Sequence, residues 1–183
     1  QLQGGQSNYL VETPSNGYFM VFEADSNDDL YWTQSTDGGY EWSAPNLLFA
    51  GVIEAMAVWY DKWTPGITGD LIHVVFMETG SDDVTYYSIN TTSGAETGNI
   101  DVLATAALTG GSDICLTIAK ARGGNLGVAF RDNAGVVLGF YKSTAEGASA
   151  SFSAMTDINE VASTDYYILA PGFAADNQDF IAA

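Results

Sequence analysis

The sequence is poor in cysteine, in histidine and in long apolar runs. Cys115 is the only cysteine among 183 residues, which excludes an intrachain disulfide and a zinc site with two thiolates. No apolar run approaches the roughly 18 residues that a membrane-spanning helix needs. His73 is the single histidine and lies in an apolar run, so we expect it to be packed and hydrogen-bonded rather than to bind a metal. No cofactor is therefore expected, apart from calcium at one turn considered below.

Basic residues are also scarce. Five Lys and Arg stand against 23 Asp and Glu, which gives a net charge of −18. Such a surface repels the phosphates of nucleic acids and anionic lipids, so we expect neither nucleic-acid binding nor membrane insertion. Hydrophobic residues make up 46% of the chain, enough for the core of one domain. The sequence predicts a single folded acidic domain over residues 1–183.

Three apolar columns recur at a spacing of 54 residues. They are Phe22, Phe76 and Phe130; Leu30, Val84 and Leu138; and Trp32, Tyr86 and Phe140. Such a period is typical of a repeat architecture, in which each unit is one supersecondary structure.

Each repeat unit is predicted to hold four short strands. The runs before the Phe column are Tyr18–Val21, Ile72–Val75 and Leu126–Ala129, and they are rich in β-branched and aromatic residues. A polar turn and the strands 30–33, 84–88 and 136–141 complete three hairpins. A further apolar strand is expected before each hairpin, at 55–60, 114–119 and 166–170, and a fourth strand is expected to close each unit, at 41–49, 99–104 and 152–158. Helical periodicity is not sustained anywhere.

The strands of the hairpins are apolar on both faces, as in Ile72–Phe76. Both faces must then be covered, which adjacent blades of a β-propeller do. The sequence predicts an all-β propeller of four-stranded antiparallel blades, at about 1–49, 50–105, 106–160 and, in part, 161–183. These are about three and a half blades of a six- or seven-bladed ring. Since Asp179–Ala183 aligns with Leu71–Val75, we expect missing blades or a partner chain to close the ring.

One turn carries a specific motif. Residues 35–42, Ser-Thr-Asp-Gly-Gly-Tyr-Glu-Trp, have the form Ser-x-Asp-x-Gly-x-x-Trp. This resembles the Asp box, or bacterial neuraminidase repeat, of the sialidase-like β-propeller superfamily. In such a turn Asp37 can accept backbone N–H bonds, and the glycines can take positive φ. The resemblance implies a structural role for Ser35, Asp37, Gly39 and Trp42, away from the substrate site. The other two units keep less of the motif at this place. Residues 143–147 of the third unit match it only in part, and residues 90–94 of the second unit do not match it.

The resemblance also implies what an enzyme of this family would need. Sialidases hold the substrate carboxylate with three arginines and use a Tyr–Glu pair and an Asp, whereas this chain has only Arg122 and Arg131. No catalytic residue can be assigned. We therefore expect a non-enzymatic propeller, acting as a structural or glycan-binding module on a secreted, cell-surface or virion protein. The alternative is half of an exo-sialidase type of glycoside hydrolase, with its other catalytic residues outside this segment.

Candidate ligand residues come from two parts of each unit. The turns between the second and third strands are expected on one rim, with Glu23, Asp25, Glu78, Arg131 and Asp132. Glu78 and Asp132 could form a carboxylate pair for glycoside hydrolysis, or these acidic turns are simply solvated. Arg131 and Asp132 could equally form a rim ion pair. Tyr60 and Trp63, after a first strand, could stack on a sugar ring or pack against the next blade.

Two further turns are candidates for modification or metal binding. Asp25, Asn27 and Asp29 offer oxygen atoms at alternate positions, as a calcium loop does, but the following glycine is missing. A plain turn is the alternative there. Asn90-Thr91-Thr92 is a glycosylation sequon, which favours an extracellular location. The expected surface module would have a glycan or a protein surface as its partner.

Overall fold

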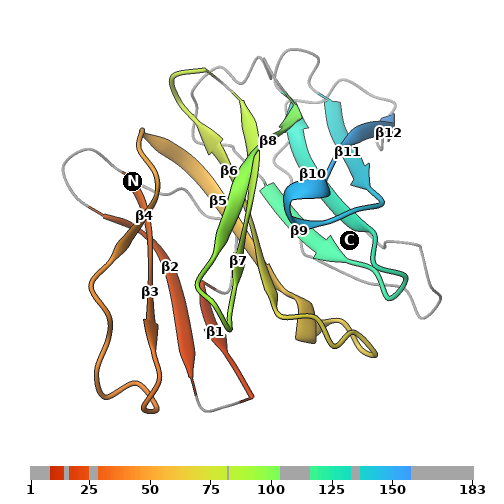
Figure 1. The fold of residues 1–183 in the computed structure, drawn as a ribbon. Helices are drawn as coiled ribbons and strands as arrows, with labels where there is room; N and C mark the ends of the chain where they lie inside the picture. Colours follow the sequence, from red (N-terminus) through yellow and green to blue (C-terminus); the bar gives the residue numbers. More distant parts are fainter. Residues whose placement is uncertain are drawn as a thin grey trace.

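The protein is built from three four-stranded antiparallel sheets (Figure 1). The computed structural model describes residues 9–14, 17–24, 29–81, 83–103, 116–132 and 137–157. The strands are β1 (Leu10–Glu12), β2 (Tyr18–Ala24), β3 (Asp29–Ser35) and β4 (Asn46–Phe49) in the first sheet; β5 (Ile53–Tyr60), β6 (Leu71–Glu78), β7 (Val84–Asn90) and β8 (Glu96–Leu103) in the second; and β9 (Leu116–Lys120), β10 (Leu126–Asp132), β11 (Val137–Ser143) and β12 (Ser153–Asp157) in the third. In every sheet each strand pairs with its neighbours in sequence. The predicted all-β class is confirmed.

The sequence repeat is also a repeat of pairing register. Phe22 pairs with Tyr31 in the first sheet, Phe76 with Thr85 in the second, and Phe130 with Gly139 in the third. In each hairpin the partner is nine residues further along the chain. Register sets which side chains share a face, so the columns that recur every 54 residues take equivalent places in the three sheets.

The second sheet lies between the other two and is buried on both faces. Along β5, Ala57 and Trp59 belong to an apolar cluster shared with the third sheet. Val58 and Tyr60 alternate with them and belong to a cluster shared with the first sheet. Side chains of a strand point alternately to the two faces, so one strand contributes to both clusters. The expectation that Ile72–Phe76 is covered on both faces is confirmed, because Phe76 faces the first sheet and Val75 the third.

Some predicted boundaries were wrong. The fourth strand of the first sheet begins at Asn46 rather than residue 41, because the preceding residues are held in a hydrogen-bonded turn. β8 begins at Glu96, three residues before the predicted start at residue 99. The short strand β1 and the 3-10 helices η1 (Asp61–Trp63) and η2 (Gly147–Ser149) have no sequence signal that we identified. The predicted strand at 166–170 and the partial unit at 161–183 lie outside the described residues.

The turns after the third strands of the second and third sheets contact the sheet before. A methyl group on Gly94 would lie 3.3 Å from Cη2 of Trp32. The backbone N–H of Gly147 donates to the hydroxyl of Tyr86 at 3.2 Å. Trp32 and Tyr86 belong to one column of the repeat, so the two contacts are equivalent. Each fixes a turn of one sheet over an aromatic side chain of the preceding sheet.

Within the described residues, no helix is both long enough and apolar enough to span a membrane.

Candidate functional site

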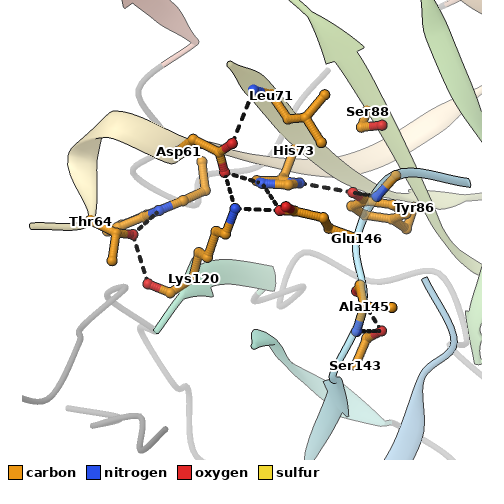
Figure 2. Close-up of polar contacts among 12 residues, drawn as sticks. Asp61, Thr64, Leu71, His73, Tyr86, Ser88, Lys120, Ser143, Ala145 and Glu146 are labelled. Atoms are coloured by element: carbon orange, nitrogen blue, oxygen red, sulfur yellow. Dashed lines mark hydrogen bonds and ion pairs between the residues drawn. The ribbon is translucent and has the colours of Figure 1, made fainter. Parts of the chain in front are cut away.

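A buried polar cluster joins the second and third sheets (Figure 2). Asp61 begins η1, directly after β5, and His73 and Tyr86 lie in β6 and β7 of the second sheet; Lys120 ends β9 of the third sheet, and Glu146 lies in the turn after β11. The first three side chains are fully buried, and Lys120 is 2% exposed. Glu146 is different, because 39% of its side chain is exposed. Among these five residues it therefore forms the contact of the cluster with solvent.

Asp61 is the centre of the cluster. It follows β5 directly and begins η1, where its Oδ2 accepts a hydrogen bond of 3.1 Å from the backbone N–H of Leu71. A methyl group on Gly69 would lie 2.1 Å from the same oxygen. A side chain at Gly69 would therefore displace the carboxylate, so the glycine allows the close approach of the chain that positions Asp61.

His73 connects Asp61 to Tyr86. Its Nε2 lies 2.7 Å from Asp61 Oδ1, and its Nδ1 lies 2.8 Å from the Tyr86 hydroxyl. The hydroxyl also accepts from the backbone N–H of Gly147. Both ring nitrogens of His73 therefore have a hydrogen-bond partner in the core. The expectation of a packed, hydrogen-bonded His73 is confirmed.

Lys120 crosses between the sheets. Its ammonium donates to Asp61 Oδ1 at 2.5 Å and also to Glu146 Oε2. Its backbone carbonyl accepts from the hydroxyl of Thr64 at 2.7 Å, and that hydroxyl in turn accepts from the indole N–H of Trp59 at 3.0 Å. Main chain and side chain of Lys120 are thus both bound to the second sheet. A buried ammonium between two carboxylates has the charge partners that burial requires.

The environment shifts two pKa values in the cluster. Burial acts to raise the pKa of Asp61, but hydrogen bonds and charge from His73, a hydrogen bond from Lys120 and the Leu71 N–H outweigh it and lower the pKa to about 2. For Tyr86, burial is the main effect and raises the pKa of the hydroxyl, and the negative charges of Glu146 and Asp61 add to it. Asp61 is therefore ionised and Tyr86 neutral at ordinary pH.

Three of these side chains could in principle bind a metal ion. Asp61, His73 and Glu146 each offer one ligand atom, and the three atoms lie within 4.8 Å of one another. The ammonium of Lys120 contacts both carboxylates and so supplies the positive charge that a cation would bring. A metal ion fits this donor set only if Lys120 moves away.

The order of groups from Tyr86 through His73 to Asp61 is that of a relay that activates a hydroxyl nucleophile. The rest of the geometry argues against that chemistry. Tyr86 is fully buried, and its oxygen already accepts the Gly147 N–H. Its pKa is raised, whereas activation would need a lowered one. The cluster is arranged to hold two sheets together.

The turn of residues 35–42 is closed by its own side chains. Asp37 Oδ1 accepts from the Ser35 hydroxyl at 2.8 Å and from the backbone N–H groups of Tyr40 and Glu41, both at 3.0 Å. The Ser35 hydroxyl accepts from the N–H of Gly39 at 2.9 Å, and the indole of Trp42 donates to the Gly39 carbonyl at 3.2 Å. The Glu41 N–H and the Ser35 hydroxyl lower the pKa of Asp37.

The turn is also the most exposed aromatic part of the first sheet. Tyr40 is 90% exposed and Trp42 38%. Gly38 and Gly39 have φ of 80° and 92°, a region that side chains with a Cβ rarely adopt. The hydrogen bonds and the two glycines fix this loop while its rings stay in solvent.

Two of the candidate ligand residues lie at opposite ends of the second sheet. Glu78 pairs with Ile53 at one end of the second sheet, and Tyr60 pairs with Ile72 near the other. Tyr60 is 1% exposed and packs edge-on against Trp63 at 6.2 Å. Tyr60 is therefore part of the core and does not present its ring to a ligand, because the first sheet covers that face. Glu78 accepts from the Ser81 hydroxyl at 2.8 Å.

Other candidates lie partly outside the description. Asp25 and Asn27 are outside the described residues, and so are the side chains of Glu23, Arg131 and Asp132. Asp29 Oδ1 accepts from the N–H of Gly51 at 2.9 Å. Asn90 closes its own turn, because its Oδ1 accepts from the N–H groups of Thr92 at 3.0 Å and Ser93 at 2.9 Å. Asn90 therefore closes its turn in the second sheet in the same way as Asp37 closes its turn in the first.

Sequence reasoning missed Asp61, Lys120 and Glu146. One signal was available, because a histidine in an apolar strand needs polar partners. Asp61 directly follows an apolar strand, and Lys120 directly follows the apolar run 114–119. The sequence around Asp61 and Lys120 does not indicate which strand each will face, since that depends on how the sheets stack.

No family model and no curated protein sequence matches this chain.

Proposed function

We propose that the three sheets are blades of a sialidase-like β-propeller that acts as a non-enzymatic structural or glycan-binding module on a secreted, cell-surface or virion protein. The proposal of a non-enzymatic role rests on how the side chains of the Asp61 cluster are bound. Its hydroxyl, imidazole, ammonium and buried carboxylate are engaged with one another across the boundary between two sheets.

The propeller part is supported by the common register of the three hairpins and by the burial of the second sheet between its neighbours. Each sheet is a four-stranded meander, which is the unit of a propeller blade. The self-closed turn at 35–42 supports the family resemblance, because its Ser, Asp, Gly and Trp bond to one another.

The glycan-binding part is supported by the exposed rings of Tyr40 and Trp42 on a fixed turn. Aromatic rings bury the C–H faces of sugars at low entropic cost when they are held in place beforehand. The net charge of −18 favours neutral over anionic sugars as ligands.

Two measurements on the purified chain test this proposal. We expect no turnover of a fluorogenic sialoside and retention on at least one neutral glycan of an immobilised panel. Turnover that survives repurification and is lost in Arg122→Ala would favour the glycoside hydrolase instead. Arg122→Lys, which keeps the charge, is the matched control. Absence of both turnover and retention would leave only the structural role.

A further inference from the structure

The Asp61 cluster brings an amine nitrogen and a carboxyl carbon close together in the core. We propose that the side chains of Lys120 and Asp61 condense to an intramolecular amide, with Glu146 as the proton carrier, and that this bond links the third sheet covalently to the second. The ion pair between the two side chains is the reactant state of that bond. The inference goes beyond the proposed function, because one self-reaction in each chain is neither enzymatic turnover nor glycan binding.

The two reacting atoms lie close to bonding distance. Nζ of Lys120 is 2.5 Å from Oδ1 of Asp61, and a C–O bond of about 1.2 Å then places it within about 3.7 Å of the carboxyl carbon. Figure 2 shows the ammonium between the carboxylates of Asp61 and Glu146. Reacting atoms about 3–3.5 Å apart are in a near-attack geometry, and groups held in this way react as if one were present at about 10⁵ M or more.

Both side chains are fixed at their bases. The backbone carbonyl of Lys120 accepts from the hydroxyl of Thr64 at 2.7 Å. Asp61 Oδ2 accepts from the N–H of Leu71 at 3.1 Å, and a methyl group on Gly69 would lie 2.1 Å from this oxygen. The fold has therefore already supplied most of the ordering that an amide between them requires.

Burial favours the amide over the ion pair. Asp61 is 0% and Lys120 2% exposed, and the desolvation of two charges is costly even when they are paired. Condensation replaces both charges with a neutral amide. The lowered pKa of Asp61 keeps the ion pair as the resting state, so the reaction is slow and the freshly made chain holds the ion pair.

The contacts give each oxygen of Asp61 a separate role. Glu146 Oε2 accepts a hydrogen bond from Nζ, so it takes one proton from the ammonium and passes it to Oδ1. The free electron pair of the amine then forms the N–C bond to Cγ, while the N–H of Leu71 stabilises the negative charge on Oδ2. Glu146 carries a second proton from the nitrogen to Oδ1, and the C–Oδ1 bond breaks with loss of water. One ammonium and one carboxylate thus give one amide and one water, with no other reactant.

Glu146 has the position that a proton carrier needs. Oxygen atoms of Glu146 and Asp61 lie within 4.8 Å of each other, so a rotation of the Glu146 carboxyl is enough to bring the proton to Oδ1. The Glu146 side chain is 39% exposed, which leaves it room to turn. The same opening to solvent lets the water that is formed leave the core.

The amide would supply a cross-link that this chain cannot obtain from cysteine. With one cysteine, the chain has no intrachain disulfide. The amide joins residues that are 59 positions apart and belong to two stacked sheets. A covalent loop of that length stabilises a protein mainly by restricting its unfolded state.

Mass spectrometry of the full chain tests the bond directly. We expect the mass of the folded protein to fall by one water during incubation. Trypsin should then fail to cleave after Lys120, because the side chain has lost its charge. Residues 1–62 should stay attached to residues 63–122 as one branched peptide, and fragmentation should place the branch at Asp61 and Lys120.

Two variants separate the bond from the ion pair. Lys120→Arg keeps a positive charge beside both carboxylates, but a guanidinium stays protonated and does not attack, so this variant should keep its full mass. Glu146→Gln keeps both reacting groups and removes the proton carrier, so it should lose water about a hundredfold more slowly or less. Because Glu146 is partly exposed, its variant keeps the test usable if Lys120→Arg fails to fold by circular dichroism.

The chain contains a second place that can lose one water. Asp37-Gly38 can close to a succinimide, but that loss would persist in Lys120→Arg and would not produce a branched peptide. A further readout comes from acid. Since an amide does not titrate, the part of the acid sensitivity that belongs to Asp61 should fade as the bond accumulates.

Three outcomes would overturn the proposal. They are a folded wild-type chain whose mass is unchanged after prolonged incubation, a loss of water that is equal in Lys120→Arg, and a branch at other residues. A Glu146→Gln variant that reacts as fast as the wild type would overturn the role of Glu146. None of these outcomes bears on glycan retention, so this inference and the proposed function fail separately.

Discussion

The backbone N–H of Gly147 in the third sheet donates a hydrogen bond of 3.2 Å to the hydroxyl of Tyr86 in the second. Gly147 has a φ of 59°, so the turn presents this N–H in a conformation that favours glycine. The same hydroxyl contacts Nδ1 of His73 at 2.8 Å. One oxygen atom thus links a turn of one sheet to the buried charge cluster of the other.

Removal of that oxygen should weaken the boundary between the two sheets. In Tyr86→Phe the Gly147 N–H and His73 Nδ1 both lose their partner inside the core. A buried polar group without a partner costs about 1–3 kcal/mol, so we expect the free energy of unfolding in urea to fall by about that amount. Tyr40→Phe removes a hydroxyl that is in solvent and should change it by less than about 0.5 kcal/mol. If the two substitutions changed the free energy of unfolding equally, the Tyr86 hydroxyl would not stabilise the boundary between the sheets.

The arrangement of strands in the sheets could be predicted from the sequence because it depends on local patterns. The spacing of Phe22, Phe76 and Phe130 predicted three hairpins, and the structure shows all three with the same register. The charge cluster could not be predicted from the sequence, because Asp61 and Lys120 are 59 residues apart and come together only when two sheets stack. His73 alone signalled a polar neighbourhood. The identity of its partners depends on a packing geometry that no local pattern encodes.

Acid should weaken the protein through Asp61. Its pKa is lowered from 3.8 to about 2 in the folded state. A group whose folded pKa is depressed stabilises the fold above its unfolded pKa, and this contribution is lost as the pH falls toward the folded value. We expect about 2 kcal/mol from Asp61 to disappear between about pH 4 and about pH 2. Urea unfolding at several pH values measures this.

Asp61→Asn is the matched variant for the acid experiment. Its side chain keeps an acceptor for Lys120 and His73 but does not titrate in this range. Its free energy of unfolding should therefore depend less steeply on pH than that of the wild type. Parallel curves for the two proteins would assign the acid sensitivity to other carboxylates, such as Asp37, whose pKa is also lowered.

Loss of the Asp37 carboxylate should loosen its turn without disturbing the sheets. In Asp37→Ala the N–H groups of Tyr40 and Glu41 lose their acceptor, whereas the Gly39 N–H keeps the Ser35 hydroxyl. We expect hydrogen exchange, followed by NMR, to accelerate at Tyr40 and Glu41 and much less at Gly39. Asp37→Asn, which keeps one carbonyl oxygen, should show a smaller change. Uniform acceleration throughout the first sheet would mean that the turn supports the whole sheet.

Replacement of Lys120 should both destabilise the cluster and open it to metal ions. Lys120→Met keeps all but the last atom of the side chain's length and leaves Asp61 buried without its ammonium partner. Breaking a buried ion pair costs about 3 kcal/mol or more, and the partial exposure of Glu146 places this case at the lower end. The three ligand atoms of Asp61, His73 and Glu146 then remain within reach of one ion.

Zinc should restore stability to that variant and not to the wild type. One histidine and two carboxylates match the donor types of three-ligand zinc sites. Binding to the folded state alone stabilises by about 2.7 kcal/mol at a hundredfold excess over the dissociation constant. We expect zinc to raise the unfolding temperature of Lys120→Met and expect a chelator to reverse the shift. The double variant Lys120→Met, His73→Gln lacks the imidazole and should not respond. An equal response of the wild type would mean that the ammonium does not block the metal ligands.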